Sequence, residues 1–497
     1  MHALGMRRHH PRRPIQHPSV RASGPLLVQF HNVRLVTPQG LVDSDLWMHG
    51  SSLVDPQLHF WERSRAKAAD RRIDCKGMLI APGMIDTMLY GAFGVDFSRC
   101  GDPGAKADAQ VAVDFEMVRR RLPELGVTAF CPAIRASDPA CCARIIARLT
   151  KSQLPSSSPE AGEAATAAWA SSTATSAQCL GVHLDGPFFD AEHAASAGAR
   201  AEHVRGSLEG DALQQACGGR ALDARIITLA PELPGAIDAI GTLISNGVIV
   251  GIGRTAASLA QCYEAISAGA RLVTHVMSSM PPFKHRDPGP VGLLADGQHH
   301  TGGDGGQPGS ARKSKPQALV HTPMGTHRAS PEIFFSMAVA SLHSCTVNLA
   351  YGANPDGLIL LSDLAERDES QSKRHKVEGE GGAERGGPPR DTDRKTFEIA
   401  EAVETADAAH ATVGTIAQSA LQLKHTTCSD DPAAALLCCS AHPARLLGLD
   451  VKGRLTPGAD ADLVLLDPAD LTVRACYVAG RLAWSHPSLH GALWYHL

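Results

Sequence analysis

Short runs of consecutive apolar residues, separated by amphipathic stretches, characterise the chain from Pro82 onward. Uninterrupted apolar runs are typical of parallel strands that are covered on both faces. Four such runs are residues 180–184, 247–251, 272–274 and 357–361. Between two of them, residues 256–268 place apolar side chains at i, i+3 and i+4, the spacing of a helix with one buried face. The repeated strand–helix unit predicts an α/β fold, a (β/α)₈ TIM-type barrel, with a doubly wound sheet as the alternative.

The two ends of the chain have a different pattern. Residues 28–30 and 33–35 alternate apolar and polar positions, which predicts short strands with one buried face up to residue 81. After a helix expected near residues 442–448, strands return until the end of the chain. We therefore predict a small β-sandwich built from residues 25–81 and 441–497, with a barrel of residues 82–440 inserted between its halves.

Four segments are too polar or too repetitive to form a packed core. Residues 1–24 are basic and lack the apolar stretch of a secretory signal, so a flexible tail is favoured over a transit peptide. Within the barrel, the stretches near residues 152–177, 296–329 and 366–395 are rich in Ser/Ala/Pro, Gly/His/Lys and charged residues with Gly/Pro, respectively. We predict these three to be disordered inserts.

Composition excludes several classes of partner. The net charge of −4 gives no electrostatic reason for binding nucleic acid or an anionic membrane, and no apolar run reaches the roughly 18–20 residues that span a bilayer. Thirteen cysteines without a C-x-x-C pair indicate core thiols in a reducing compartment. We expect a cytoplasmic protein; the alternative is a peroxisome-like organelle, through the weak C-terminal signal Tyr495-His496-Leu497.

Polar residues directly follow many of the apolar runs. The active site of a (β/α)₈ barrel lies at the carboxyl ends of its strands. Carboxylate and imidazole side chains at those positions are the ligands of a hydrolytic metal, which activates water and polarises an amide, while a carboxylate transfers the proton. The candidates are Asp86, His183, Asp185, Arg254, His275, His343 and Asp363.

A set of sequence blocks carries a resemblance to a known family. In order along the chain they are LIAPGMID (79–86), GAFGVDFS (91–98), GVTAFCP (126–132), HLDGPF (183–188), LAPE (229–232), TH (274–275), FKHRDPG (283–289) and PGADAD (457–462). The last block is typical of the amidohydrolase superfamily. The ordered set resembles the N-acetylglucosamine-6-phosphate deacetylase family, from about residue 25 to the end without the inserts.

The resemblance implies a metal site with substituted positions. It assigns Asp185 and His275 as metal ligands, with Asp185 in place of a family Glu. Arg254 stands where the family has a ligating His, and a guanidinium cannot ligate a cation. Where relatives carry H-x-H or Q-x-N on the first strand, this chain has Met88 and Tyr90 around Leu89.

The resemblance also implies roles around the substrate. Asp363 matches the proton-transferring acid/base. The other matches concern the sugar and its phosphate: His343 as a substrate contact that has Ala340-Ser341 beside it in place of Asp-Gly, Arg200 at a substrate His, Arg286 as a phosphate anchor, and Ser278 and Ser279 at a phosphate-binding turn. Two residues have simpler interpretations: His183 as a core histidine rather than a replacement ligand, and Asp86 as a structural carboxylate.

The implied function is metal-dependent hydrolysis of the acetyl amide of N-acetylglucosamine 6-phosphate. The expected cofactor is one divalent ion, zinc first, with iron or cobalt as alternatives, and a homodimer is expected. The substitutions leave a second hypothesis open: a catalytically impaired homologue that binds a sugar phosphate or has a regulatory role. A related hydrolase of another N-acyl substrate is a third hypothesis, disfavoured because Arg286 and the phosphate turn are retained.

Overall fold

The computed structural model describes residues 25–57, 69–99, 108–151, 175–195, 201–299, 332–339, 342–362, 364, 414–427 and 431–489. The predicted tail and the insert near residues 366–395 lie outside the described residues, and so does most of the other two inserts. Residues 296–299, which begin the second predicted insert, continue the 3₁₀ helix η5 (Gly289–His299).

Eight parallel strands form a nearly closed barrel in the middle of the molecule. Their order is β8 (Met84–Leu89), β11 (Val127–Arg135), β13 (His183–Asp185), β14 (Ile226–Leu229), β15 (Ile249–Ile252), β16 (Leu272–Val273), β17 (Phe334–Met337) and β18 (Leu358–Leu360). The short strand β12 (Gln178–Cys179) pairs with Ala129 and Phe130 in the first half of β11. The predicted (β/α)₈ class is confirmed.

The ends of the barrel sheet are connected through a loop near the C-terminus. The backbone N–H of Ile85 in β8 donates to the Cys439 carbonyl at 2.8 Å, and that of Leu360 in β18 donates to the Cys438 carbonyl at 3.1 Å. The Ser362 hydroxyl after β18 also donates to Asp86 in β8. These contacts hold the first and last barrel strands beside each other.

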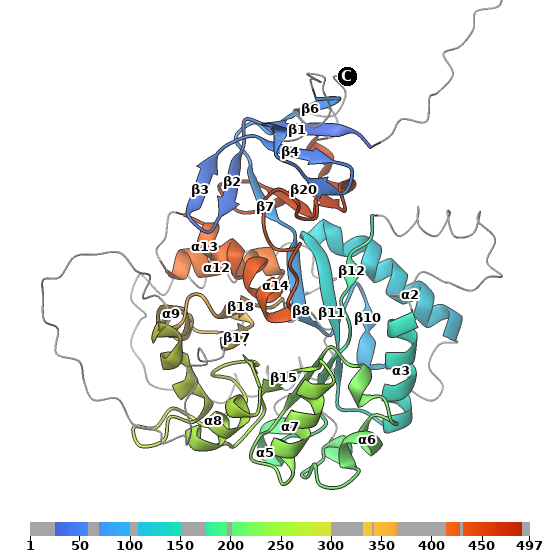
Figure 1. Ribbon diagram of the computed structural model, residues 1–497, viewed down its shortest axis with the longest axis vertical. Helices are drawn as coiled ribbons and strands as arrows, with labels where there is room; N and C mark the ends of the chain where they lie inside the picture. The colour runs from blue at the N-terminus through green and yellow to red at the C-terminus, as the bar shows by residue number, and fades with distance from the viewer. Residues whose placement is uncertain are drawn as a thin grey trace, which may run out of the picture.

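Helices surround the barrel strands, as Figure 1 shows. The longer ones are α2 (Asp108–Arg121), α3 (Pro139–Lys151), α7 (Ala236–Ser245), α8 (Leu259–Ser267), α9 (Ser344–Ala353) and α12 (Ile416–Thr426); the shorter ones are α5 (Ala191–Ala195), α6 (Ala212–Ala216), α13 (Ala433–Leu437) and α14 (Ala441–Leu447). Helix α8 begins later than the predicted residue 256 because Ser258 forms a capping box with Gln261. The predicted helix near residues 442–448 is confirmed as α14. It ends at Leu447, and Gly448 caps it with a left-handed backbone conformation.

Both ends of the chain contribute to two small sheets above the barrel (Figure 1). One has the order β5 (Ser52–Leu53), β4 (Leu46–His49), β1 (Leu27–His31) and β6 (Arg71–Asp74). The other has the order β21 (Arg481–Ser485), β20 (Val473–Val478), β19 (Leu463–Leu466), β7 (Leu79–Pro82), β2 (Arg34–Thr37) and β3 (Gly40–Asp43). Strand β7 pairs with β19 in antiparallel register, so the predicted joining of the two chain ends is confirmed.

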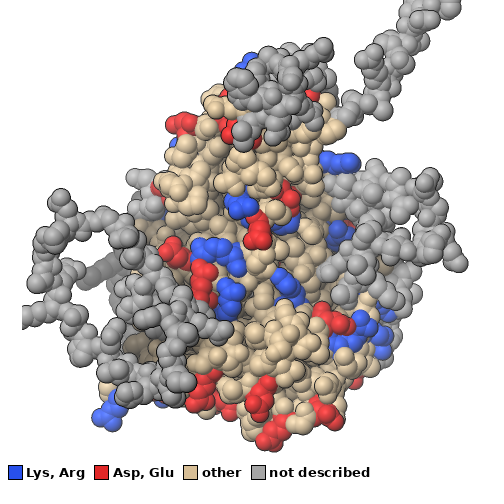
Figure 2. All heavy atoms as spheres, in the orientation of Figure 1, with Lys and Arg blue, Asp and Glu red and all other residues tan. Residues whose placement is uncertain are grey.

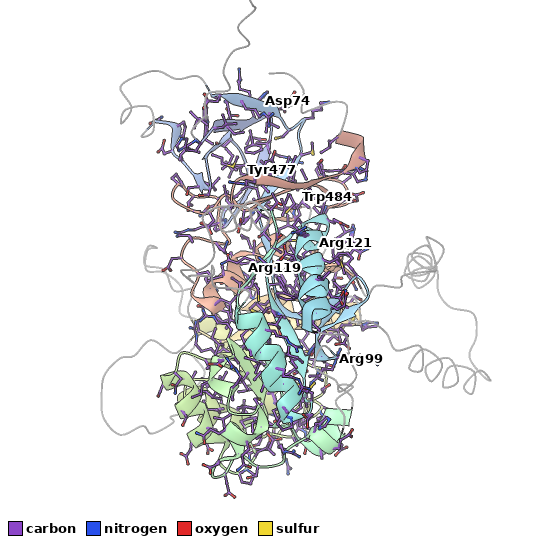
Figure 3. The ribbon with its side chains drawn as sticks, turned by 90° about the vertical axis from the view of Figure 1, so that its right-hand side faces the viewer. Asp74, Arg99, Arg119, Arg121, Tyr477 and Trp484 are labelled. Atoms are coloured by element: carbon purple, nitrogen blue, oxygen red, sulfur yellow. The ribbon has the colours of Figure 1, made fainter. Side chains whose placement is uncertain are left out.

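A separate hydrophobic core fills the space between these two sheets. It includes Phe30, Ile80, Leu463 and Tyr477, and the rings of Phe30 and Tyr477 meet edge to face at 5.4 Å. Trp484 on the other side of the larger sheet packs against the main core of the barrel. Figure 3 shows Trp484 beside the end of α2 that carries Arg119 and Arg121. The small sheets therefore rest on the barrel through the C-terminal strands.

Charges of both signs are interspersed on the face drawn in Figure 2, in agreement with the small net charge. No helix among the described residues is long and apolar enough to cross a membrane. The prediction that cysteines fill the core is confirmed for the described cysteines apart from Cys345, which is exposed near the start of α9. None of the described cysteines forms a disulfide.

Candidate functional site

A buried ion pair lies at the carboxyl ends of the barrel strands. Asp185 is the last residue of β13, and Arg254 follows β15 by two residues. The Arg254 Nη2 and Nε atoms donate to Asp185 Oδ2 at 2.9 and 3.1 Å, and Nε also lies 3.3 Å from Oδ1. The side chains are only 6% and 1% exposed, so little water reaches the pair. Two residues that the sequence places 69 positions apart thus form the centre of the site.

Tyr90 and His275 complete the same network. The Tyr90 hydroxyl, just after β8, donates to Asp185 Oδ2 at 2.7 Å and lies 3.3 Å from Nε2 of His275. It also accepts from Arg254 Nη2 at 3.3 Å. The structure therefore brings the two predicted metal ligands, Asp185 and His275, close together. The Tyr90 hydroxyl lies between them, and the Arg254 guanidinium binds Asp185.

The backbone around this network adopts an uncommon conformation. Arg254, His275, Met277 and Ser279 all have φ between 41° and 64°, in the left-handed region that residues with a Cβ rarely occupy. Each such residue costs about 1–3 kcal/mol and persists only where the surrounding structure enforces it. Four of the nine described non-glycine residues with positive φ lie in the loops after β15 and β16, which makes this end of the barrel the candidate site.

Two contacts fix the loop that carries Arg254. Its carbonyl oxygen accepts from the Asp190 N–H at 3.1 Å. The next two residues are held by the carboxylate of Glu232, which accepts from the Thr255 hydroxyl and, at 2.6 Å, from the Ala256 N–H. Glu232 belongs to the LAPE block, to which the sequence assigned no role. Here it positions the loop that presents the guanidinium.

Electrostatics keeps both partners of the ion pair charged. Burial acts to raise the pKa of Asp185, but the opposite charge and the hydrogen bonds of Arg254, together with His275 and Tyr90, lower that pKa to about 2. Burial likewise acts to lower the pKa of Arg254, and Asp185 and Tyr90 raise it above its usual value. At neutral pH the network therefore contains one carboxylate and one guanidinium.

His183 takes no part in this network. Its Nδ1 donates to the Thr87 carbonyl oxygen at 2.8 Å, and its Nε2 accepts from the Thr228 hydroxyl at the same distance. Burial lowers the pKa of this imidazole, so it is neutral and both of its nitrogens are occupied. His183 is thus seen as a satisfied core histidine and has no lone pair left for a metal.

Asp86 holds the end of the last barrel strand. Its Oδ1 accepts from the Met88 N–H at 3.0 Å and its Oδ2 accepts from the Ser362 hydroxyl. Burial raises the pKa of this carboxyl group. Asp363, the predicted acid/base, lies outside the described residues, but its neighbour Ser362 is buried and tied to Asp86.

The predicted phosphate-binding residues are divided by the structure. The Ser279 hydroxyl accepts from Arg254 Nη1 at 3.2 Å and so belongs to the ion-pair network, while Ser278 is exposed on the same turn. Arg286 is exposed on the loop before η5. The next residue, Asp287, anchors that loop by accepting from the N–H groups of Leu259 and Gly289 at 2.9 and 3.1 Å.

His343 has a structural contact that the sequence did not predict. It is exposed at the N-cap of α9, where its Nδ1 accepts from the Cys345 N–H at 3.2 Å. This leaves Nε2 as the atom with which it could contact a substrate. Arg200 and Ala340 lie outside the described residues.

The described residues do not fit a divalent cation. A zinc ion here would need a carboxylate oxygen and imidazole nitrogens at about 2.0–2.2 Å, each with a lone pair directed at the metal. Asp185 Oδ2 already accepts from Tyr90 Oη and from two nitrogens of Arg254. At an effective dielectric constant of about 20, a divalent ion ~4 Å from the guanidinium would be repelled by roughly 8 kcal/mol. Among the described residues no group of three His, Cys, Asp or Glu side chains could hold an ion.

Tyr90 is the site residue that sequence reasoning undervalued. The sequence identifies it as a substituted position on the first strand and gives it no role of its own. The structure shows it fully buried, with its ring covered by the Arg135 guanidinium at 3.9 Å and its hydroxyl between Asp185 and His275. A buried tyrosine needs a hydrogen-bond partner, which is the signal that could have indicated this role.

Comparison with known proteins agrees with this architecture. The family model described as "Amidohydrolase family" matches residues 401–483. N-acetylglucosamine-6-phosphate deacetylase of Bos taurus is 34% identical over 464 residues, covering 92% of this chain and 96% of the relative. The Homo sapiens protein of that name is 33% identical over 469 residues, covering 93% of this chain and 97% of its own.

Solved structures show the same fold at lower identity. N-acetylglucosamine-6-phosphate deacetylase from Pasteurella multocida superposes with a TM-score of 0.63 at 18% identity, covering 93% of this chain and all of its own. A mutant enzyme of that kind from Mycobacterium smegmatis, in complex with N-acetyl-D-glucosamine-6-phosphate, gives a TM-score of 0.61 at 20% identity, with 93% and 100% coverage. On the relatives' identity and coverage, the chain belongs to the N-acetylglucosamine-6-phosphate deacetylase family of the amidohydrolase superfamily.

Proposed function

We propose that this protein hydrolyses the acetyl amide of N-acetylglucosamine 6-phosphate, giving glucosamine 6-phosphate and acetate. The observation that carries this proposal is the 34% identity to a named deacetylase across 92% of the chain. The fold supports it, because the barrel places the candidate residues at the carboxyl ends of its strands, where such enzymes bind their substrates.

Amide hydrolysis needs positive charge near the carbonyl oxygen, because negative charge develops there as water attacks the carbon. Among the described residues of the network, the group that can donate to that oxygen is the Arg254 guanidinium, because the Tyr90 hydroxyl already donates its proton to Asp185. The amidohydrolase superfamily is typically metal-dependent, but the described residues do not fit a divalent ion, so no step is assigned to one. Among the described residues, Arg254 is the cation that contacts Asp185.

Proton transfer is the second requirement of the reaction. We assign it to Asp363, as the resemblance implies. The carboxylate takes a proton from water as the new C–O bond forms and delivers it to the nitrogen as the C–N bond breaks, so that acetate and the amine leave. The hydrogen bond from Ser362 to Asp86 supports this role, because it fixes the residue before Asp363.

Substrate contacts remain proposals from the same resemblance. We assign the sugar to His343 and Arg200, and the phosphate to Arg286, Ser278 and Ser279, where a guanidinium and hydroxyls suit anionic oxygens. A homodimer stays a prediction on the same basis, and a cytoplasmic location stays a prediction from the cysteine pattern.

A second function is favoured by one specific observation. The charge of Arg254 is paired with that of Asp185, and a guanidinium cannot lower the pKa of a bound water to near neutrality as a metal does. The protein would then bind N-acetylglucosamine 6-phosphate without cleaving it and act as a sugar-phosphate-binding or regulatory homologue.

Acetate release from N-acetylglucosamine 6-phosphate separates the two functions. The assay is run on full-length protein without added metal and then with zinc, cobalt or iron(II), and Asp363→Asn is the control. Turnover that disappears in the control supports the deacetylase. No turnover under any condition, combined with a rise in melting temperature on adding the sugar phosphate, supports the binding protein instead.

A further inference from the structure

We propose that Arg254 is the resident cation of this site, and that its guanidinium takes the place of the divalent ion of a metal-dependent amidohydrolase. The chain would then bind no stoichiometric metal between Asp185 and His275. The inference concerns which positive charge holds the site together, and it stands whether or not the acetamide is cleaved.

The carboxylate of Asp185 carries the first step of the argument. Its Oδ2 atom accepts three hydrogen bonds, from Tyr90 Oη at 2.7 Å and from Arg254 Nη2 and Nε at 2.9 and 3.1 Å. Its Oδ1 atom also faces Nε at 3.3 Å. Three donor atoms therefore surround Oδ2, and a metal ion at this oxygen would have to displace at least one of them.

The second step concerns charge. One carboxylate faces one guanidinium in a space from which water is nearly excluded, with side chains 1% and 6% exposed. The pair is therefore electrically balanced. A divalent ion would add two positive charges next to Arg254, without a further carboxylate among the described residues of the network to compensate them.

The third step concerns replacement ligands. His183 would be the nearest candidate by sequence, but Thr87 and Thr228 occupy its two nitrogens. Tyr90 stands between Asp185 and His275, within 2.7 and 3.3 Å of them, where its hydroxyl donates a proton to the carboxylate. In the described part of the network, a metal ion would therefore meet a phenol that keeps its proton, an imidazole, and a carboxylate whose charge is balanced by Arg254.

The fourth step is that the guanidinium is built into the fold. Arg254 has a φ of 50°, its carbonyl is bound by the Asp190 N–H, and the following loop is bound by Glu232. Because these contacts fix the backbone of Arg254 and of the residues after it, they also fix where its side chain begins. Its outer Nη1 atom, which donates to Ser279, is directed toward the turn assigned to the phosphate.

Metal content of the full-length protein tests the inference directly. The wild type, Arg254→His and the matched control Arg254→Lys are equilibrated with zinc, passed through a desalting column and analysed for bound metal. Asp185→Asn in the wild-type background reports zinc bound elsewhere. Arg254→Lys keeps the positive charge, whereas Arg254→His exchanges it for a ligand beside Asp185 and His275.

We expect the wild type and Arg254→Lys to retain below about 0.1 zinc per chain beyond the Asp185→Asn background, and Arg254→His to retain about one. Zinc should raise the melting temperature of Arg254→His by several degrees and leave that of the wild type unchanged. These readouts do not require substrate turnover, so failure of the proposed function leaves them intact.

Three results would overturn the inference. One is about one zinc per chain in the wild type that Asp185→Asn removes. The second is equal zinc content in Arg254→His and Arg254→Lys when both are folded by circular dichroism. If Arg254→His does not fold even with zinc present, the wild type decides alone: an Asp185-dependent melting shift with zinc contradicts the inference, and its absence supports it.

Discussion

Two largely buried ion pairs among the described residues differ in what surrounds them. Lys452 donates to Asp462 at 2.5 Å and to Asp460 at 2.9 Å, within the PGADAD block that leads into β19. Arg254 pairs with Asp185 at 2.9 Å at the mouth of the barrel. The Lys452 pair joins residues ten positions apart, whereas the Arg254 pair joins loops that are 69 residues apart.

The difference indicates which pair is structural and which belongs to a site. Asp462 also accepts from the Ala479 N–H at 2.8 Å, so the Lys452 pair ties a loop to the small sheets, and neither Lys452 nor Asp462 has a positive φ. The Arg254 pair involves two further polar side chains, Tyr90 and Ser279, and lies among residues in a costly backbone conformation. Burial and charge are common to both pairs, and Ala479 beside Asp462 also has a positive φ of 46°. The convergence of several polar side chains at the ends of barrel strands is what distinguishes the candidate site.

The largest effect is expected when one partner of the Arg254 pair is removed. Arg254→Met leaves the Asp185 carboxylate buried and without its counter-charge, which should lower the free energy of unfolding by about 3–5 kcal/mol. Urea denaturation at pH 7 measures this change. A loss below about 1 kcal/mol would show that the pair is solvated and that our description of the site is mistaken.

A buried ionisable group on which desolvation outweighs the nearby charges should behave differently, and His442 is such a group. Burial lowers its pKa to about 4, and its Nδ1 donates to the Leu358 carbonyl at 2.7 Å. Because the folded-state pKa is depressed, this histidine contributes stability above the unfolded pKa of about 6.5. That contribution, up to about 3 kcal/mol, is lost as the pH falls from about 6.5 toward 4.

Urea denaturation between pH 7 and pH 4 measures the His442 effect, with His442→Gln as the control because glutamine can keep the hydrogen bond without titrating. We expect a flatter dependence on pH in the variant. Identical slopes for the two proteins would mean that His442 is not responsible.

A smaller loss is expected at the structural pair. Lys452→Met removes the cation, but Asp462 keeps its bond from Ala479, and Asp460 is 35% exposed and open to water. We expect a loss of about 1–2 kcal/mol with acetate release unchanged. The comparison between the two pairs fails if this variant loses activity while its melting curve stays like that of the wild type.

The smallest effect is expected at Ser279. Ser279→Ala removes one neutral acceptor of Arg254 Nη1 at 3.2 Å, which should cost at most about 1 kcal/mol of stability because the bonds to Asp185 remain. If Ser279 also binds the phosphate, KM for the sugar phosphate should rise while kcat changes little. Unchanged KM in the folded variant would remove Ser279 from the phosphate site.

Most of the architecture could be predicted because it depends on local patterns. The apolar runs at residues 247–251 and 357–361 became β15 and β18, and the alternating segments at residues 28–30 and 33–35 became part of β1 and β2. Apolar positions repeat every two residues in a half-buried strand and every 3.6 residues in a helix. These repeats involve neighbouring residues, so one sequence is enough to detect them.

The site was predicted only in part because it depends on contacts between distant residues. The sequence identified Arg254 as unable to ligate a metal, but not that its guanidinium contacts Asp185 and Tyr90. The direction of a side chain after a strand depends on backbone φ, and φ of Arg254 is positive, which no pattern of apolar positions reveals. His343 shows the same limit, since its capping of α9 depends on where that helix begins.

The most direct test of the central claim, that a guanidinium holds the cation position, is a crystal structure of the wild type soaked in zinc and measured at the zinc absorption edge. We predict that the Arg254 guanidinium lies within hydrogen-bond distance of the Asp185 carboxylate and that no anomalous peak appears between Asp185 and His275. An anomalous peak within about 2.0–2.2 Å of Asp185 and His275, with Arg254 displaced, would contradict the account.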